Sequence, residues 1–119
     1  MYEKITQYIT GLKEKKYGVL VKSLGGYTYN EFIEDMLDDI YDFANQKSIR
    51  NPQKILEKAG IAEESYMTVD TDSLNGEDVF ALIFINVLKE KFDAGRVFNL
   101  CENGQLLKWL TRLEEIDRE

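Results

Sequence analysis

The chain has 119 residues, 44% of them hydrophobic, and a formal net charge of −7. This length is sufficient for one ordinary hydrophobic core, so we expect a single domain. Histidine is missing from the sequence, which excludes Ser-His-Asp and Cys-His catalysis, His-ligated haem and HExxH zinc sites. The acidic charge also argues against nucleic-acid binding, which depends on basic side chains that neutralise phosphates.

Several features favour a cytoplasmic protein. Residues 1–16 form an amphipathic pattern and lack the basic and apolar regions of a signal peptide. The single cysteine, Cys101, cannot form an intramolecular disulfide. The apolar run at residues 79–85 is much shorter than the roughly 20 residues that a membrane span requires. We therefore expect a cytoplasmic location and no membrane partner.

Residues 2–15 have the spacing of an amphipathic helix. Its apolar residues recur at i, i+3, i+4 and i+7 and would share one face: Ile5, Tyr8, Ile9 and Leu12. The following stretch, residues 17–24 (YGVLVKSL), is the one place where a short strand is plausible, because Gly18 and the pair Gly25-Gly26 punctuate it. Here we favour a helical or irregular connection.

A capping box at residues 28–31 is the clearest local signal in the sequence. Thr28 and Glu31 would each accept a hydrogen bond from the other's backbone amide, and Tyr27 and Phe32 occupy the flanking staple positions. This pattern predicts a helix that starts at Tyr29. Its inner face would consist of Ile33, Met36, Leu37, Ile40 and Ala44.

A helix at residues 76–92 is the predicted centre of the fold. Asn75 can cap its start, with Asp78 in the capping-box position and Leu74 and Val79 in the staple positions. A helix that is apolar nearly all round belongs in a core. Asn86 is the one polar residue that interrupts the apolar run, and the sequence offers no reason for it.

Three further helices complete the prediction. One begins at Asn51-Pro52 and ends before Gly60. A short helix at 96–102 is stopped by Asn103-Gly104. The last helix places its apolar residues on one face: Leu106, Trp109, Leu110, Leu113 and Ile116. The predicted fold is a single compact all-α domain, residues 1–119, with five or six helices packed around residues 76–92.

The C-terminal part of the chain contains a series of short motifs. They are Ala81-Leu82-Ile83, Glu90-Lys91-Phe92-Asp93-Ala94-Gly95, Asn103-Gly104, Trp109-Leu110 and Arg112-Leu113. This pattern resembles the ALI…ERFC-x-G…L-x-R-L segment of a family of small bacterial proteins of unknown function. The resemblance extends from Asn75 onwards, with a looser likeness over residues 30–60. It implies a mostly helical fold and supplies no activity.

Two positions depart from the family pattern. Lys91 stands where the family has arginine, and Asp93 stands where it has cysteine. Any chemistry that depends on that arginine and cysteine would therefore be absent from this protein. A structural role would tolerate the change more easily.

Five acidic residues fall along one face of the helix that starts at Tyr29: Glu31, Glu34, Asp35, Asp38 and Asp42. No basic residue occurs from 27 to 45. A solvated face opposite the apolar one is the simplest interpretation. The lopsided charge also permits an acidic docking surface. A carboxylate site for Mg²⁺, Mn²⁺ or Ca²⁺ is the third interpretation.

Other motifs favour structural interpretations. Residues 70–81 fail as a calcium-binding loop, because Leu74, Asn75 and Ala81 occupy positions that need an oxygen ligand, a glycine and a glutamate. The glycines form no phosphate-binding motif. Cys101 reads as a buried structural thiol. The lysines beside Tyr17 read as a solvated helix end, with nucleic-acid contact as the alternative: Lys13, Lys15, Lys16 and Lys22.

We also predict an ion pair between Glu90 and Arg112, which would join the central helix to the last one. Each charge lies beside apolar residues of the predicted core, so such a pair would be partly buried.

The sequence assigns no catalytic residue, cofactor or metal ligand. Its leading prediction is a non-enzymatic interaction or regulatory protein, with the acidic helix face as its binding surface for a protein partner or a second copy of the chain. One alternative is an enzyme that uses carboxylates with a metal or small molecule. The other is an acidic nucleic-acid mimic that binds basic proteins.

Overall fold

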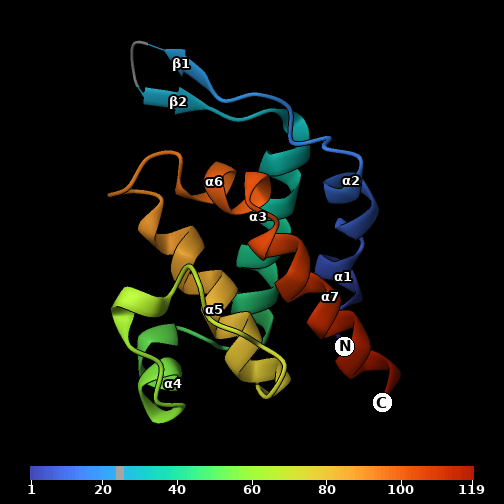
Figure 1. The fold of residues 1–119 in the computed structure, drawn as a ribbon, viewed down its shortest axis with the longest axis vertical. Helices are drawn as coiled ribbons and strands as arrows, with labels where there is room; N and C mark the ends of the chain where they lie inside the picture. The colour runs from blue at the N-terminus through green and yellow to red at the C-terminus, as the bar shows by residue number, and fades with distance from the viewer. Residues whose placement is uncertain (24–25) are drawn as a thin grey trace.

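The structure, a computed structural model, describes residues 1–23 and 26–119. Its described part contains seven α-helices, one short 3-10 helix and one two-stranded hairpin (Figure 1). The helices are α1 (Glu3–Thr6), α2 (Ile9–Lys13), α3 (Glu31–Gln46), α4 (Pro52–Lys58), η1 (Glu63–Ser65), α5 (Gly76–Lys89), α6 (Arg96–Glu102) and α7 (Gln105–Arg118). The strands are β1 (Val21–Ser23) and β2 (Gly26–Thr28). The predicted compact all-α domain is therefore confirmed.

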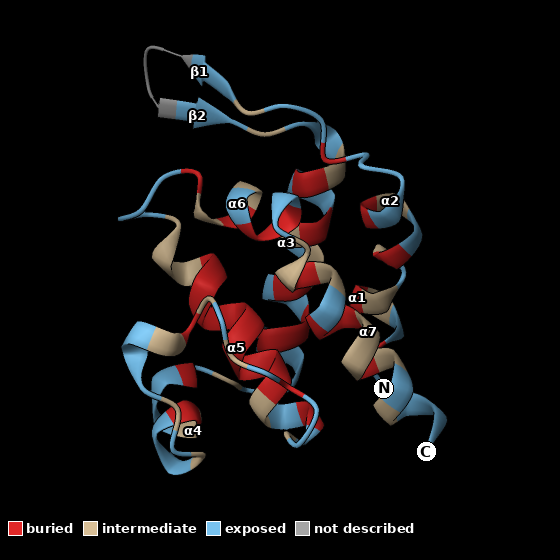
Figure 2. Ribbon diagram, viewed as in Figure 1, coloured by how far each residue is buried: buried red, intermediate tan, exposed pale blue. Residues whose placement is uncertain are grey.

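Helix α5 is the centre of this domain. Every residue from Val79 to Val87 is buried, and α3, α4, α6 and α7 all contact the helix (Figure 2). Such complete enclosure explains why the sequence of α5 is apolar on all sides. The helix is three residues shorter than predicted, because it ends at Lys89 and Phe92 lies in the following turn.

Asparagine side chains cap three of the helices. Asn75 accepts a hydrogen bond from the amide of Asp78 (2.8 Å), and Asn51 accepts one from Lys54 (3.3 Å), so both predicted starts are confirmed. The predicted start of α3 is wrong by two residues. Asn30 caps this helix by accepting from the amide of Ile33 (3.1 Å), and Thr28 belongs to β2.

The hairpin corrects the prediction of a helical or irregular connection at residues 17–24. Val21 pairs with Thr28 and Lys22 with Tyr27 in an antiparallel register. Cross-strand pairing of Thr28 removes it from the helix start, because a residue in a ladder has extended backbone geometry. Leu24 and Gly25, which the sequence interpretation also used, lie outside the described residues.

The N-terminal helix forms in two pieces. Residues Gln7 and Tyr8 separate α1 from α2, which differs from the single helix predicted over 2–15. The predicted apolar face is nevertheless buried at Ile5, Ile9 and Leu12, which pack in the common core, while Tyr8 is half-buried. The helical pattern was therefore correct for the face and wrong for continuity.

The position of Phe32 explains why α2 contains a glycine at residue 11. A Cβ atom at this position would lie 2.3 Å from Cε2 of Phe32, which is closer than side-chain atoms can approach. The ring of Phe32 also contacts the ring of Tyr8 edge-on. The absence of a side chain at Gly11 thus allows the ring of Phe32 to lie against α2.

The two chain ends meet on the same side of the domain (Figure 1). The backbone amide of Tyr2 donates to Asp117 (2.7 Å), and the terminal amino group lies 3.2 Å from the same carboxylate. Among the described residues, no helix combines the length and apolar composition of a transmembrane segment.

Candidate interaction surface

Helix α3 displays the five acidic residues that the sequence singled out: Glu31, Glu34, Asp35, Asp38 and Asp42. All five are exposed, while the opposite side of the helix is buried. Asp42 forms an ion pair with Lys4 of α1 (3.3 Å). The predicted face therefore exists as a surface, which we call the acidic face, and one end of it is covered by a lysine.

A sixth carboxylate on α3, Asp39, has a structural role that the sequence did not reveal. It accepts hydrogen bonds from the hydroxyl of Tyr8 and from Gln7 Nε2 (3.1 Å). Burial and this carboxylate raise the pKa of Tyr8. Asp39 thus connects α3 to the break between α1 and α2 and is separate from the acidic face.

Next to the acidic face is a hollow with a cavity volume of about 310 Å³, which we call the aromatic hollow. It is lined by Tyr27, Tyr29, Leu37, Tyr41, Val87, Glu90, Lys91 and Ala94. These residues come from β2, the link before α3, the middle of α3, the end of α5 and the turn after it. The side chains of Tyr27 and Tyr41 remain more than 40% exposed, at 44% and 41%.

Helical spacing joins the hollow to the acidic face. Leu37 and Tyr41 lie four residues apart on α3, so both project into the hollow from one side of the helix. Glu34 and Asp38 occupy the adjacent positions of the same stripe. A partner that enters the hollow would therefore meet acidic side chains at its edge.

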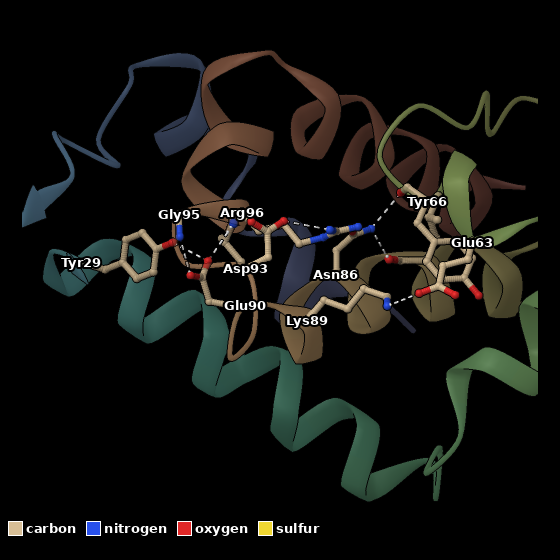
Figure 3. A network of polar contacts seen from close by, with 11 residues as sticks. Tyr29, Glu63, Tyr66, Asn86, Lys89, Glu90, Asp93, Gly95 and Arg96 are labelled. Atoms are coloured by element: carbon tan, nitrogen blue, oxygen red, sulfur yellow. Dashed lines mark hydrogen bonds and ion pairs between the residues drawn. The ribbon is translucent and has the colours of Figure 1, made fainter. Parts of the chain in front are cut away.

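Glu90 holds the turn that forms the other wall of the hollow. Its carboxylate accepts hydrogen bonds from the Tyr29 hydroxyl and from the backbone amides of Gly95 (2.6 Å) and Val97 (2.9 Å), as Figure 3 shows for the first two. These amides belong to the start of α6, whose own N-cap is glycine. Glu90 therefore supplies the missing cap from the end of the preceding helix. Burial and the carboxylate raise the pKa of Tyr29.

The same turn is connected to the core through Asn86. Its amide nitrogen donates to the carbonyls of Leu82 (2.8 Å) and Tyr66 (2.9 Å), and its amide oxygen accepts from Arg96 Nε (2.7 Å) (Figure 3). Arg96 also pairs with Asp93 (3.0 Å). A buried amide is stable only when its hydrogen-bonding groups have partners. This network is thus the reason for a polar residue in the apolar run.

The rigid turn carries an exposed aromatic side chain. Phe92 lies between Glu90 and Asp93 and is 91% exposed. The sequence predicts this residue inside the central helix, because the apolar pattern continues to it. Phe92 is exposed because α5 ends at Lys89 and the following turn is held by the contacts of Glu90 and Arg96. The apolar pattern of the sequence does not reveal these contacts.

The predicted ion pair between Glu90 and Arg112 is wrong. Glu90 is occupied by Tyr29 and the start of α6, whereas Arg112 donates to the carbonyl of Leu74 (3.1 Å). Arg112 also lies within 3.8 Å of Glu115 and 3.7 Å of Glu119. Each residue therefore has other partners, and the two do not link α5 to α7. Among the described residues, Arg112 Nε is buried without a hydrogen-bond partner.

The thiol and carboxyl groups that could take part in catalysis or metal binding show no arrangement suited to either among the described residues. Cys101 is buried, and burial raises the pKa of its thiol to about 12, so the thiol is protonated at neutral pH. Burial also raises the pKa of the Asp78 carboxyl, which lies in the first turn of α5 and does not line the aromatic hollow. Over residues 1–23 and 26–119, no group of three or more cysteine, aspartate or glutamate side chains is arranged to hold a metal ion.

The four lysines of the predicted basic cluster are exposed. Lys16 lies 3.3 Å from Glu14, and the carbonyl of Lys16 accepts from Asn30 Nδ2 (2.7 Å). Tyr17, which the sequence placed beside the lysines, is buried and donates to Glu102 (2.8 Å). Its ring is therefore unavailable for stacking on a base.

No family model, curated protein or solved structure matches this chain. The resemblance of the C-terminal part to small bacterial helical proteins stays a prediction from the sequence pattern.

Proposed function

We propose that this protein is a non-enzymatic interaction module that binds a segment of another protein. The segment has an apolar side chain that enters the aromatic hollow and flanking basic residues that lie on the acidic face. The single observation that supports this proposal most strongly is the position of Leu37 and Tyr41. Both residues line the hollow, and they lie on the same side of α3 as Glu34 and Asp38.

The exposed aromatic side chains support a protein partner in preference to a nucleic-acid mimic. Tyr27, Tyr41 and Phe92 keep much of their area in solvent, although burial of apolar area is favourable by about 25 cal/mol per Å². Tyrosine and other aromatic residues commonly form the centre of protein interfaces. A mimic of nucleic acid needs a continuous acidic surface, and here the acidic surface borders an aromatic one.

Charge complementarity determines the chemistry of the partner. Within the described residues, Glu34, Asp35 and Asp38 form no ion pair with the protein's own basic residues, so their charges remain available. A basic segment would be attracted to this face and would associate more slowly at high salt. A second copy of the chain is disfavoured as partner, because the net charge of −7 makes two copies repel.

A peptide probe tests the proposal directly. The probe is a short peptide with a central leucine between lysines, and its matched control has glutamates in place of the lysines. We expect the basic peptide to shift the backbone amide resonances of α3 and of the turn after α5, and the acidic peptide to shift neither. Binding should weaken by about tenfold in Tyr41→Ser and in the pair Glu34→Gln/Asp38→Asn.

A matched charge control separates specific binding from general attraction. The pair Glu57→Gln/Glu64→Gln removes the same charge from exposed positions around α4 and η1. If this control weakened the basic peptide as much as Glu34→Gln/Asp38→Asn, attraction to the whole acidic chain would explain the binding and the proposed surface would be wrong. An unfolding curve for each variant shows that the fold is retained.

A further inference from the structure

A second and larger cavity lies against α7. It has a volume of about 810 Å³, and none of its lining residues belongs to the acidic face or the aromatic hollow. One wall is the segment 68–72, which precedes α5. The other wall consists of α7 residues between Gly104 and Glu115, and Lys13 of α2 closes one side. We call this space the α7 cavity. Its volume is in the range of small-molecule sites, which is roughly 300 to 1,000 Å³.

The walls of the α7 cavity are held together by side-chain hydrogen bonds. Trp109 Nε1 donates to the carbonyl of Val69 (3.3 Å), and Arg112 Nη2 donates to the carbonyl of Leu74 (3.1 Å). Trp109 is fully buried, and the adjacent Thr71 is 5% exposed. The segment 68–74 is therefore fixed along α7 by its two ends, which gives the cavity a defined shape.

The charged groups of the cavity differ in how far the protein uses them. The Glu115 carboxylate lies beside Arg112, and the Asp70 carboxylate accepts from the amide of Asp72 (3.0 Å). By contrast, Lys13 and Lys108 are exposed, and the described part of the chain provides no carboxylate within ion-pair distance of either. The Asp72 carboxylate also lines the cavity, is exposed and forms no ion pair within the described residues. Two lysines and one aspartate with uncommitted charge thus line this cavity.

We propose that the α7 cavity binds a small organic anion, such as a phosphate ester or carboxylate of a metabolite. Lys13 and Lys108 contact its acidic group, and the half-buried Leu107 provides an apolar contact for its organic part. Charge-assisted hydrogen bonds are roughly twice as strong as neutral ones, so contacts from the two lysines would favour an anionic group. The inference is independent of the proposed interaction function, because the two sites share no residue.

Phenyl phosphate is a suitable probe, with inorganic phosphate and benzylamine as comparisons. Trp109 is the only tryptophan of the chain and lines the cavity, so its fluorescence reports occupancy. We expect phenyl phosphate to change this fluorescence saturably and to bind more tightly than inorganic phosphate, which lacks the organic part. Benzylamine has the ring and the opposite charge, and we expect no saturable change with it.

Two variants locate the binding. Lys13→Gln/Lys108→Gln should weaken phenyl phosphate by about tenfold or more. The matched control Lys54→Gln/Lys58→Gln removes the same charge from exposed positions of α4 and should bind like the unmodified protein. Equal binding by Lys13→Gln/Lys108→Gln and the unmodified protein would overturn the proposal, as would benzylamine binding as tightly as phenyl phosphate. Amide resonance shifts confined to 68–72 and α7 would confirm the location.

Discussion

Carboxylates on α3 and at the end of α5 show how the surroundings of one chemical group decide its role. Glu90 is held by a tyrosine hydroxyl and two backbone amides, so its position determines the path of the turn into α6. Glu34 and Asp38 are exposed on α3 and have no such partners among the described residues. A partly buried carboxylate with fixed donors contributes about 1.5 to 3 kcal/mol per charged hydrogen bond, whereas exposed charges contribute little.

Asn86 is another polar group whose partners are fixed inside the fold, and its replacement should cause the largest loss of stability. Asn86→Leu keeps a similar volume but leaves Arg96 Nε and the Tyr66 carbonyl without their partner. We expect a loss of about 3 kcal/mol in the free energy of unfolding, measured by urea denaturation. The control Asn99→Leu, on an exposed position of α6, should change it by less than about 0.5 kcal/mol. Equal losses in both variants would contradict the importance of the network.

Glu90→Gln should have the next largest effect. Glutamine has the same shape, but its NH₂ group would face one of the two backbone amides that the carboxylate now accepts from. We expect a loss of about 2 kcal/mol in stability and faster amide hydrogen exchange at the start of α6. Glu64→Gln, at an exposed position, is the matched control. Unchanged exchange at Gly95 and Val97 would show that Glu90 does not cap α6.

Tyr29→Phe removes a single donor to Glu90 and should cost about 1 kcal/mol at neutral pH. Its pH dependence is more informative. The folded protein raises the pKa of Tyr29 above its usual value near 10, so the neutral form stabilises the fold. This contribution is fully present below about pH 10 and is lost as the pH rises through the raised pKa. We therefore expect stability above pH 10 to fall less steeply in Tyr29→Phe. The same slope in both proteins would contradict the hydrogen bond.

Substitutions in the acidic face should reduce peptide binding and leave the stability of the fold almost unchanged. Replacing Glu34, Asp35 and Asp38 by their amides should change the free energy of unfolding by no more than about 0.5 kcal/mol, because all three are exposed. The same variant should lose the binding of the basic peptide. A large loss of stability would place these residues on the structural side of the comparison.

Phe92→Ser should have the smallest effect on stability. Phe92 is 91% exposed, so its replacement removes almost no buried area. We expect an unfolding midpoint indistinguishable from that of the unmodified protein in thermal denaturation. A clear decrease would mean that the ring packs against the turn, and the turn would then no longer be a rigid support for an exposed aromatic side chain.

Features that depend on neighbouring residues could be predicted from the sequence. The apolar run of α5 predicted a buried central helix, and Asn75 and the pair Asn51-Pro52 predicted the starts of two helices. Gly60 and Gly104 have positive φ angles at the predicted helix boundaries. The alternation of charged and apolar residues on α3 also predicted which side would face solvent. All of these signals act within one or two helical turns, so a local pattern is sufficient to read them.

Features that depend on distant residues could not be predicted, because they arise from contacts that form only in the folded chain. Thr28 has a good capping sequence, but pairing with Val21 places it in a strand and leaves Asn30 as the cap. Glu90 bonds to Tyr29 instead of Arg112, because the turn brings Tyr29 and the start of α6 to the same carboxylate. A hydrogen-bonding group takes whichever partner the folded chain brings within about 3 Å, and a one-dimensional pattern does not contain that distance.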